Sequence, residues 1–127
     1  MKLLLDTHAL LWWLLDDADL PATARRAIAR AEVVRVSAAS IWEVAIKQRL
    51  GKLPELALAV AELPALVRQS GFLPLPVDER HAAAVASLPL RHRDPFDHLL
   101  IAQAQIEGLT LVSRDAQLAD YGVALRW

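Results

Sequence analysis

Four acidic residues stand along the chain where their carboxylates could do chemistry together. Asp6 follows a short apolar run, Glu43 lies in a mostly apolar stretch, Asp97 follows an Asp-Pro-Phe sequence, and Asp115 follows Leu-Val-Ser-Arg. Carboxylates that share one site repel one another, and desolvation increases the repulsion, so such a group needs a cation. Oxygen ligands of this kind suit Mg²⁺, with Mn²⁺ as a substitute. A bound ion of this type activates water and polarises a phosphoryl oxygen, so the pattern favours metal-dependent phosphodiester hydrolysis.

The residues that must position these acids predict alternating strands and helices. Strands are expected at residues 2–5, 33–36, 72–77, 109–113 and 123–125, and helices at 7–16, 22–31, 38–50, 55–70, 78–88, 95–107 and 116–121. This alternation predicts an α/β fold, namely a three-layer α/β/α domain with a central, mainly parallel sheet of about four or five strands. Ligands bind such sheets at the carboxyl ends of the strands, which is where Asp6 and Asp115 fall.

Prolines and caps refine these boundaries. Pro64 is expected to break or kink the helix at 55–70, and the two prolines in 72–77 restrict that segment to an edge strand or an extended loop. Asp94 followed by Pro95 is typical of an N-cap and the first helical position.

The four histidines are not expected to bind a metal. His8 and His98 adjoin candidate ligands, but solvated or helix-packed histidines are the favoured interpretation, and His81 and His92 are expected on the surface.

Length and composition bound the class of protein. The 127 residues fit one domain spanning residues 1–127, and the absence of cysteine excludes disulfides, zinc–cysteine sites, iron–sulfur clusters and thiol nucleophiles. The absence of cysteine also favours a reducing compartment, so a cytoplasmic protein is expected. No apolar run is long enough to cross a membrane. The net charge of −1 does not indicate a general polyanion binder. If the four acids gather in one site, however, the remaining surface carries 14 basic and 11 acidic residues.

Four short blocks, in this order and spacing, resemble the PIN-domain ribonucleases, and more narrowly VapC, the toxin of bacterial VapBC toxin–antitoxin pairs. The blocks are LLLDT at residues 3–7, SIWE at 40–43, DPFD followed by LLIAQA from residue 94, and LVSRD at 111–115. The resemblance covers the whole chain. It implies a Mg²⁺- or Mn²⁺-dependent endoribonuclease in which Asp6, Glu43 and Asp97 bind the metal and Asp115 is the fourth acid. Thr7 and Ser113 would be hydroxyls that orient a carboxylate or water; relatives more often have threonine at position 113 and arginine at position 98.

The same resemblance implies partners: an RNA substrate, a VapB-type antitoxin and a second copy of the chain in a homodimer, with no direct DNA binding expected without the antitoxin. Arg91, Arg93 and Arg114 flank the acids and could contact RNA phosphates, or they could form an ordinary solvated face. Trp12 and Trp13 lie in a helix that is apolar all round, so one face is expected at an interface unless the next helix covers it.

Each acid also has a structural interpretation. Asp6 and Asp115 could cap the helices that follow them, and Glu43 could complete a capping box with Ser40, although the helix is expected to begin near Ser37. Two other functions remain open. A metal-dependent phosphatase or phosphotransfer domain commonly needs Asp-x-Asp after the first strand, but residue 8 is His8. A non-catalytic interaction module would use the acids only as caps.

Overall fold

The five strands form one parallel sheet in a computed structural model that describes residues 1–52, 59–89 and 94–127. Its order is β3-β2-β1-β4-β5, so β1 lies at the centre and the chain crosses to the other side of β1 after β3. The strands are β1 (Lys2–Leu5), β2 (Val33–Ser37), β3 (Leu73–Leu75), β4 (Thr110–Val112) and β5 (Leu125–Arg126). The predicted parallel sheet is confirmed.

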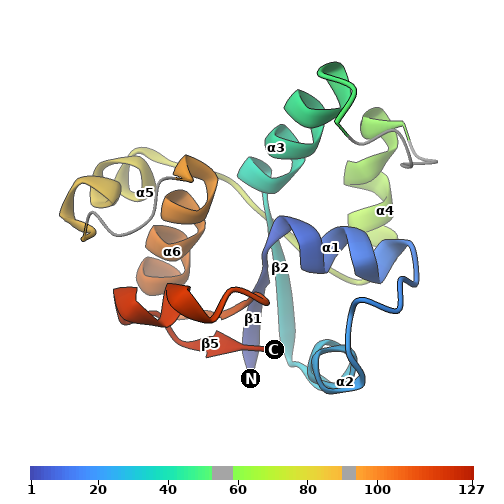
Figure 1. The fold of residues 1–127 in the computed structure, drawn as a ribbon, viewed down its shortest axis with the longest axis horizontal. Coiled ribbons are helices and arrows are strands. Elements are labelled where there is room, and N and C mark those ends of the chain that lie inside the picture. The colour runs from blue at the N-terminus through green and yellow to red at the C-terminus, as the bar shows by residue number, and fades with distance from the viewer. Residues whose placement is uncertain (53–58, 90–93) are drawn as a thin grey trace.

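Helices cover both faces of this sheet (Figure 1). The α-helices are α1 (Thr7–Leu14), α2 (Ala22–Arg30), α3 (Ala38–Arg49), α4 (Leu63–Gln69), α5 (Glu79–Ala84) and α6 (Pro95–Glu107), and the 3₁₀ helices are η1 (Val60–Glu62), η2 (Val85–Ser87) and η3 (Ala116–Tyr121). The three-layer α/β/α architecture is therefore as predicted. Among the described residues, no helix has both the length and the apolar character needed to cross a membrane.

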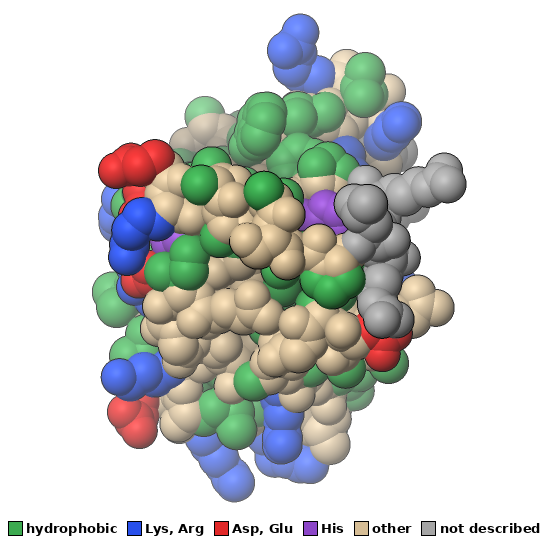
Figure 2. Space-filling model, turned by 90° about the vertical axis from the view of Figure 1, so that its left-hand side faces the viewer, with side chains coloured by type: hydrophobic (Ala, Val, Ile, Leu, Met, Phe, Trp, Pro, Cys, Tyr) green, Lys and Arg blue, Asp and Glu red, His purple; other side chains and the backbone are tan. Residues whose placement is uncertain are grey.

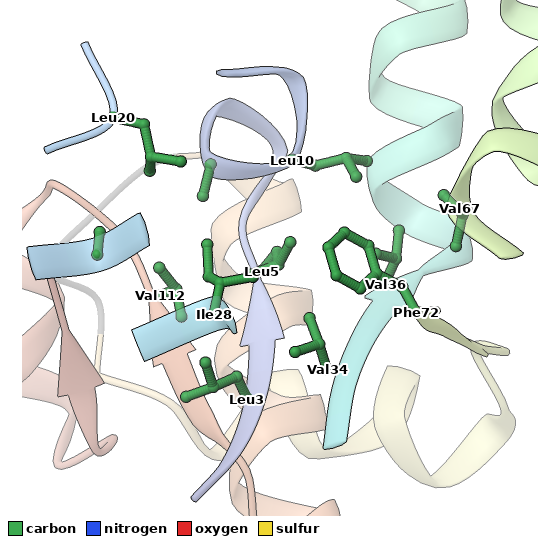
Figure 3. Close-up of a cluster of buried hydrophobic side chains, with 12 residues drawn as sticks. Leu3, Leu5, Leu10, Leu20, Ile28, Val34, Val36, Val67, Phe72 and Val112 are labelled. Atoms are coloured by element: carbon green, nitrogen blue, oxygen red, sulfur yellow. The ribbon is translucent and has the colours of Figure 1, made fainter. Parts of the chain in front are cut away.

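The central strand divides the core into two layers because successive side chains point to opposite faces. Leu3 and Leu5 pack with α1 and α2 in one cluster, shown in Figure 3, whereas Leu4 packs with α6 and η3 in the other. All three leucines are fully buried. A strand that is apolar on both faces is typical of a parallel sheet that helices cover on both sides. The strand β1 is therefore a rigid base for Asp6, the residue that follows it.

Two boundary predictions need correction. Pro64 does not kink a long helix; it lies in the first turn of α4, where its missing N–H costs nothing, and residues 59–62 before it are not α-helical. Residues 55–58 of that predicted helix lie outside the described residues. The helix expected to reach residue 16 ends at Leu14, and Asp16 has a left-handed φ of 51°. The segment with two prolines is the edge strand β3, as predicted.

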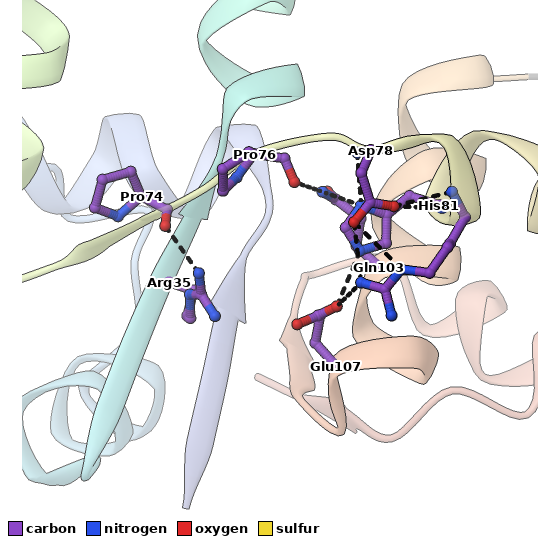
Figure 4. A network of polar contacts seen from close by, with 8 residues as sticks. Arg35, Pro74, Pro76, Asp78, His81, Gln103 and Glu107 are labelled. Atoms are coloured by element: carbon purple, nitrogen blue, oxygen red, sulfur yellow. Dashed lines mark hydrogen bonds and ion pairs between the residues drawn. The ribbon is translucent and has the colours of Figure 1, made fainter.

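His81 is the third correction, because it is 1% exposed and not on the surface. Its Nδ1 accepts the Asp78 N–H at 3.0 Å, and its Nε2 lies 3.0 Å from Glu107 Oε2 on α6 (Figure 4). Asp78 returns the contact by accepting the His81 N–H, which makes a capping box at the start of α5. His81 is thus buried because it joins α5 to α6. His92 lies outside the described residues.

Candidate active site

All four predicted acids line one cavity of about 440 Å³. Asp6 follows β1, its N–H donates to the Val112 carbonyl of β4 at 3.0 Å, and Ser113 and Asp115 follow β4. The cavity therefore opens at the carboxyl ends of β1 and β4, which lie on either side of the point where the strand order reverses. Glu43 reaches it from α3 and Asp97 from the first turn of α6.

Asp6 is both a helix cap and a buried carboxylate of this cavity. It is 9% exposed, it accepts the Ala9 N–H at 2.8 Å, and the Ser113 hydroxyl donates to it. Burial raises the pKa of the Asp6 carboxyl, and the nearby Asp97 carboxylate adds to the rise, while the two hydrogen bonds oppose it. The ionised form is thus costly here, which is the condition under which a cation would be attracted.

Glu43 lies inside α3 and is 6% exposed. Because Ser37 caps this helix and α3 begins at Ala38, a capping box between Glu43 and Ser40 is ruled out. The Thr7 hydroxyl donates to Glu43 Oε1, and Lys47 Nζ lies 2.8 Å from Oε2. Glu43 therefore faces the cavity with each of its oxygens engaged by a neighbour.

Three further aspartates line the cavity at helix starts. Asp94 accepts the Phe96 N–H at 2.9 Å as the N-cap of α6, as predicted, and Asp115 accepts the Gln117 N–H at 3.0 Å as the N-cap of η3. Asp97 occupies the first turn of α6. Asp6 and Asp115 therefore both cap helices, as one interpretation of the sequence expected. Both also line the cavity, since each cap uses a single carboxylate oxygen.

The donor chemistry of the cavity fits a hard divalent cation. Its oxygen ligands are carboxylates from separate elements, one of them strongly desolvated, and neither cysteine nor a histidine cluster competes for a softer metal. Across the described residues, however, no three acidic or histidine side chains already stand close enough together to hold an ion. The pairing of Glu43 with Lys47 is one physical reason. Binding of an ion would therefore require these side chains to converge.

The remaining predicted site residues divide into three groups. Thr7, Ser113 and Arg114 line the cavity with the acids. Trp12 also lines it, whereas Trp13 packs against Phe72, with ring centroids 5.8 Å apart. Both tryptophans are partly buried on the core beside α2, so their interface role stays a prediction. Arg91 and Arg93 lie outside the described residues.

Two further residues line the cavity that the sequence did not place there, Lys47 and Asp94, the second of which was predicted only as a helix cap. Lys47 carries a usable signal, because Glu and Lys four residues apart on a helix pair with one another. Of the two histidines beside the acids, His8 lines the cavity, and His98 Nε2 lies 3.2 Å from the Tyr121 hydroxyl.

An apolar cavity of about 430 Å³ between α3, α5 and α6 was also missed. Trp42 on its wall is 60% exposed, and its ring meets Phe96 edge-on with centroids 5.2 Å apart. Figure 2 shows the side of the molecule formed by α5 and α6, where hydrophobic side chains gather toward the upper edge. Since Trp42 precedes Glu43 and Phe96 precedes Asp97, this apolar groove adjoins the acid-lined cavity.

Comparison with known proteins gives consistent results. A model of the PIN domain family matches residues 3–124. Ribonuclease VapC22 of Mycobacterium tuberculosis is 32% identical in an alignment of 123 positions that covers 93% of this chain and 90% of the relative. Ribonuclease VapC16 of the same organism is 46% identical over 50 residues, which are 39% of this chain and 36% of that relative.

Solved structures share the fold at lower identity. A chain of VapBC2 from Rickettsia felis, solved bound to a DNA fragment from the promoter, matches with a TM-score of 0.69 at 14% identity over 99% of this chain and 98% of that chain. VapC20 of Mycobacterium tuberculosis, described as a toxin that cleaves the sarcin-ricin loop, matches with a TM-score of 0.67 at 18% identity over 97% of each chain.

Proposed function

The chain belongs to the PIN domain family and, within it, to the VapC ribonucleases, and from this premise we propose that it is a Mg²⁺- or Mn²⁺-dependent endoribonuclease acting as the toxin of a toxin–antitoxin pair. Residues 1–127 would form a single PIN domain. One observation carries the proposal: four carboxylates from separate elements line one cavity at the carboxyl ends of β1 and β4, and one of them, Asp6, is strongly desolvated.

The carboxylates of Asp6, Glu43, Asp97 and Asp115 would hold the metal. A bound divalent ion would polarise a phosphoryl oxygen of the substrate and would lower the pKa of a water molecule, so that this water could attack phosphorus as hydroxide. The chain's own residues orient these ligands: the Thr7 hydroxyl donates to Glu43, and the Ser113 hydroxyl donates to Asp6. Hydrolysis by water would leave a 5′-phosphate and a 3′-hydroxyl end, and no protein nucleophile is needed.

Two cationic side chains in the cavity would receive the RNA phosphate. Arg114 is exposed at the rim and can donate to non-bridging phosphate oxygens with its planar guanidinium. Lys47 neutralises Glu43 and would have to turn away if Glu43 joined the metal ligands. Against the phosphatase alternative, residue 8 is His8, and Asp6 is committed to hydrogen bonds with Ala9 and Ser113, which lower the nucleophilicity of a carboxylate.

Cleavage of a labelled RNA by the wild-type chain and by Asp6→Asn tests the proposal. We expect cleavage with Mg²⁺, none with EDTA, and a loss on the order of 100-fold or more in Asp6→Asn, because a ligand contributes at least as much as its outer-shell partners. Asp120→Asn, at an exposed position of η3, is the matched control and should cleave normally. The proposal would be refuted if the wild type cleaved equally with Mg²⁺ and with EDTA and if Asp6→Asn cleaved as well as the wild type.

For the antitoxin, we propose that an apolar segment fills the groove of Trp42 and Phe96 and that a basic side chain beyond it enters the acid-lined cavity. The support is the exposed Trp42 ring and the neighbouring negative charge. Co-expression with a VapB-type antitoxin tests this. The partner should co-purify with the wild-type chain and be lost from Trp42→Asp, while Trp42→Asp still cleaves RNA; retention of the partner by Trp42→Asp would contradict it.

A homodimer is the remaining proposed partner arrangement. The chain mass of 14.0 kDa means that sedimentation equilibrium should give a particle of twice that mass. A monomer at every concentration would contradict the dimer without touching the proposed nuclease activity.

A further inference from the structure

We propose that single-stranded RNA extends from the acid-lined cavity along an arginine–tryptophan track into a second, basic hollow on α2. The track consists of Arg114, Trp12, Trp127 and Arg126 and ends between Arg26 and Arg30. The inference rests on the proposed function only in that the ligand is RNA, because binding along the track does not require cleavage.

Without a bound cation, the side chains of the acid-lined cavity do not favour the binding of RNA. Five carboxylates line it, and like charge repels the phosphate backbone. Of the two basic side chains that line it, Lys47 is paired with Glu43, which leaves Arg114. Favourable phosphate contacts must therefore come from residues outside the cavity.

Contacts given by the structure lead continuously away from the cavity. The Arg114 guanidinium lies over the Trp12 ring, 5.0 Å from its centroid, and the Trp12 and Trp127 rings follow with centroids 5.9 Å apart. All three side chains keep some solvent exposure. Aromatic rings beside an arginine are a sequence-tolerant platform on which bases of single-stranded RNA stack.

Arg126 precedes Trp127 and lines a hollow of about 240 Å³ together with Arg26 and Arg30 of α2. The two α2 arginines are four residues apart and so share one face of the helix. All three arginines are exposed, and none of them forms an ion pair with another residue in the described ranges. Arg25, beside Arg26 on the same helix, is by contrast 2.8 Å from Asp16.

Three guanidinium groups that meet around one hollow and lack acidic partners favour an anionic ligand. Phosphates of RNA fit because the hollow is reached from the cavity through aromatic rings that can stack bases. An acidic segment of a protein partner would be drawn to the same arginines, but its carboxylates would gain nothing from the two tilted tryptophan rings. The geometry therefore favours single-stranded nucleic acid. Its bases would stack on the tryptophan rings, and its phosphates would contact Arg114 at one end and the arginines of the hollow at the other.

Charge reversal tests the track in binding assays in which EDTA prevents cleavage. The probes are a fluorescein-labelled 20-nucleotide RNA of mixed sequence and a 4-nucleotide RNA, followed by fluorescence anisotropy over a series of salt concentrations. Arg26→Glu/Arg30→Glu should weaken binding of the 20-mer at least about tenfold and reduce the slope of log K against log salt by about 1.5, since each single-strand phosphate contact contributes about 0.7. Binding of the 4-mer should change less than about twofold.

The matched control is Arg49→Glu/Arg68→Glu, which makes the same change in net charge at exposed positions that line neither cavity. An equal loss in control and test variants, or an unchanged salt slope in the test variant, would overturn the proposal. If Arg26→Glu/Arg30→Glu does not fold, the neutral variant Arg26→Gln/Arg30→Gln takes its place, and its unfolding temperature is compared with that of the wild type.

Mn²⁺-dependent cleavage of the 4-mer should survive in the test variant, so loss of the track and failure of the proposed nuclease are distinguishable. Weakened antitoxin binding with unchanged RNA binding would assign the hollow to the protein partner and contradict the inference.

Discussion

Asp6 caps a helix, and we propose that it is also a metal ligand; these two roles have the same sequence signal. An aspartate directly after a strand and before a helix is a good N-cap and is also where α/β folds place catalytic carboxylates. Asp6 accepts the Ala9 N–H, and its burial in the cavity raises the pKa of its carboxyl. The sequence could therefore predict its position but not its desolvation, which depends on how α1, β4 and α6 close around it.

The raised pKa of Asp6 has a definite consequence for stability. Because the folded state binds the proton more tightly than the unfolded state, the ionised carboxylate destabilises the fold as pH rises above its ordinary value of 3.8 and through the higher folded value. In EDTA at pH 7.5, Asp6→Asn should raise the unfolding temperature by about 2–5 °C, since asparagine keeps the cap and removes the buried charge. The difference from the wild type should shrink as the pH is lowered toward 4.5 in a series of thermal melts.

Asp78→Asn is the matched control because Asp78 also caps a helix but has a pKa lowered by its hydrogen bonds with Arg80. Its loss of charge should lower the unfolding temperature, the opposite sign. If Asp6→Asn also lowered the unfolding temperature in EDTA, the acids would be acting only as caps, as in a non-catalytic module.

Lys47 forms an ion pair with Glu43 and so supplies the positive charge that a metal ion would otherwise supply. Its Nζ lies 2.8 Å from Glu43 Oε2, and a positive charge at that position opposes the approach of a divalent ion. Lys47→Met should therefore bind Mn²⁺ about fivefold more tightly in isothermal titration, which corresponds to about 1 kcal/mol. Arg49→Met, on the same helix but outside the cavity, should leave the affinity unchanged. Weaker Mn²⁺ binding by Lys47→Met would show that Lys47 organises the site and does not compete with the metal.

At the scale of elements, helix starts were predictable and some segment contacts were not. Ser37 and Asp94 cap α3 and α6 as their residue types suggest, and the prolines of β3 restrict it to the sheet edge. Pro64 was misjudged because a proline inside an apolar run can either kink a helix or begin one. The burial of His81 had no local signal, since its neighbours Glu79 and Arg80 are exposed and its partner Glu107 is 26 residues away.

The contact between α5 and α6 predicts a pH-dependent stability. The hydrogen bond from His81 and the nearby charges hold the pKa of Glu107 below its ordinary value of 4.5. A carboxylate with a lowered folded pKa stabilises the protein above its unfolded pKa, and this contribution is lost as pH falls through the folded value. Glu107→Gln should lower the unfolding temperature by about 2–4 °C at pH 7.

Circular dichroism melts of the wild type, Glu107→Gln and the exposed control Glu62→Gln would measure this effect. The gap between wild type and Glu107→Gln should narrow as the pH falls below 4.5, the ordinary pKa of the carboxyl, and should close only below the lowered pKa of the folded state. A gap that persists unchanged in acid would mean that Glu107 contributes packing and no charge–dipole interaction with His81.

At the scale of the whole molecule, the strand order creates the site. The alternation of strands and helices predicted a parallel sheet, but it could not specify that β1 pairs with both β2 and β4. That order brings Asp6 and Asp115, more than 100 residues apart in the sequence, to the rim of one cavity. Glu43 and Asp97 join them because α3 and α6 begin at the same edge. The convergence of the acids is thus a property of topology and not of any single motif.

The direct test of this convergence is a crystal soaked in Mn²⁺ and measured for anomalous scattering. We predict one strong peak in the acid-lined cavity, with oxygens of Asp6 and at least one of Glu43, Asp97 and Asp115 within about 2.5 Å of it. Lys47 Nζ should have moved away from any Glu43 oxygen that binds the ion. Crystals that bind Mn²⁺ only elsewhere on the surface, with the acids arranged as they are around Lys47 and the helix caps, would contradict the account.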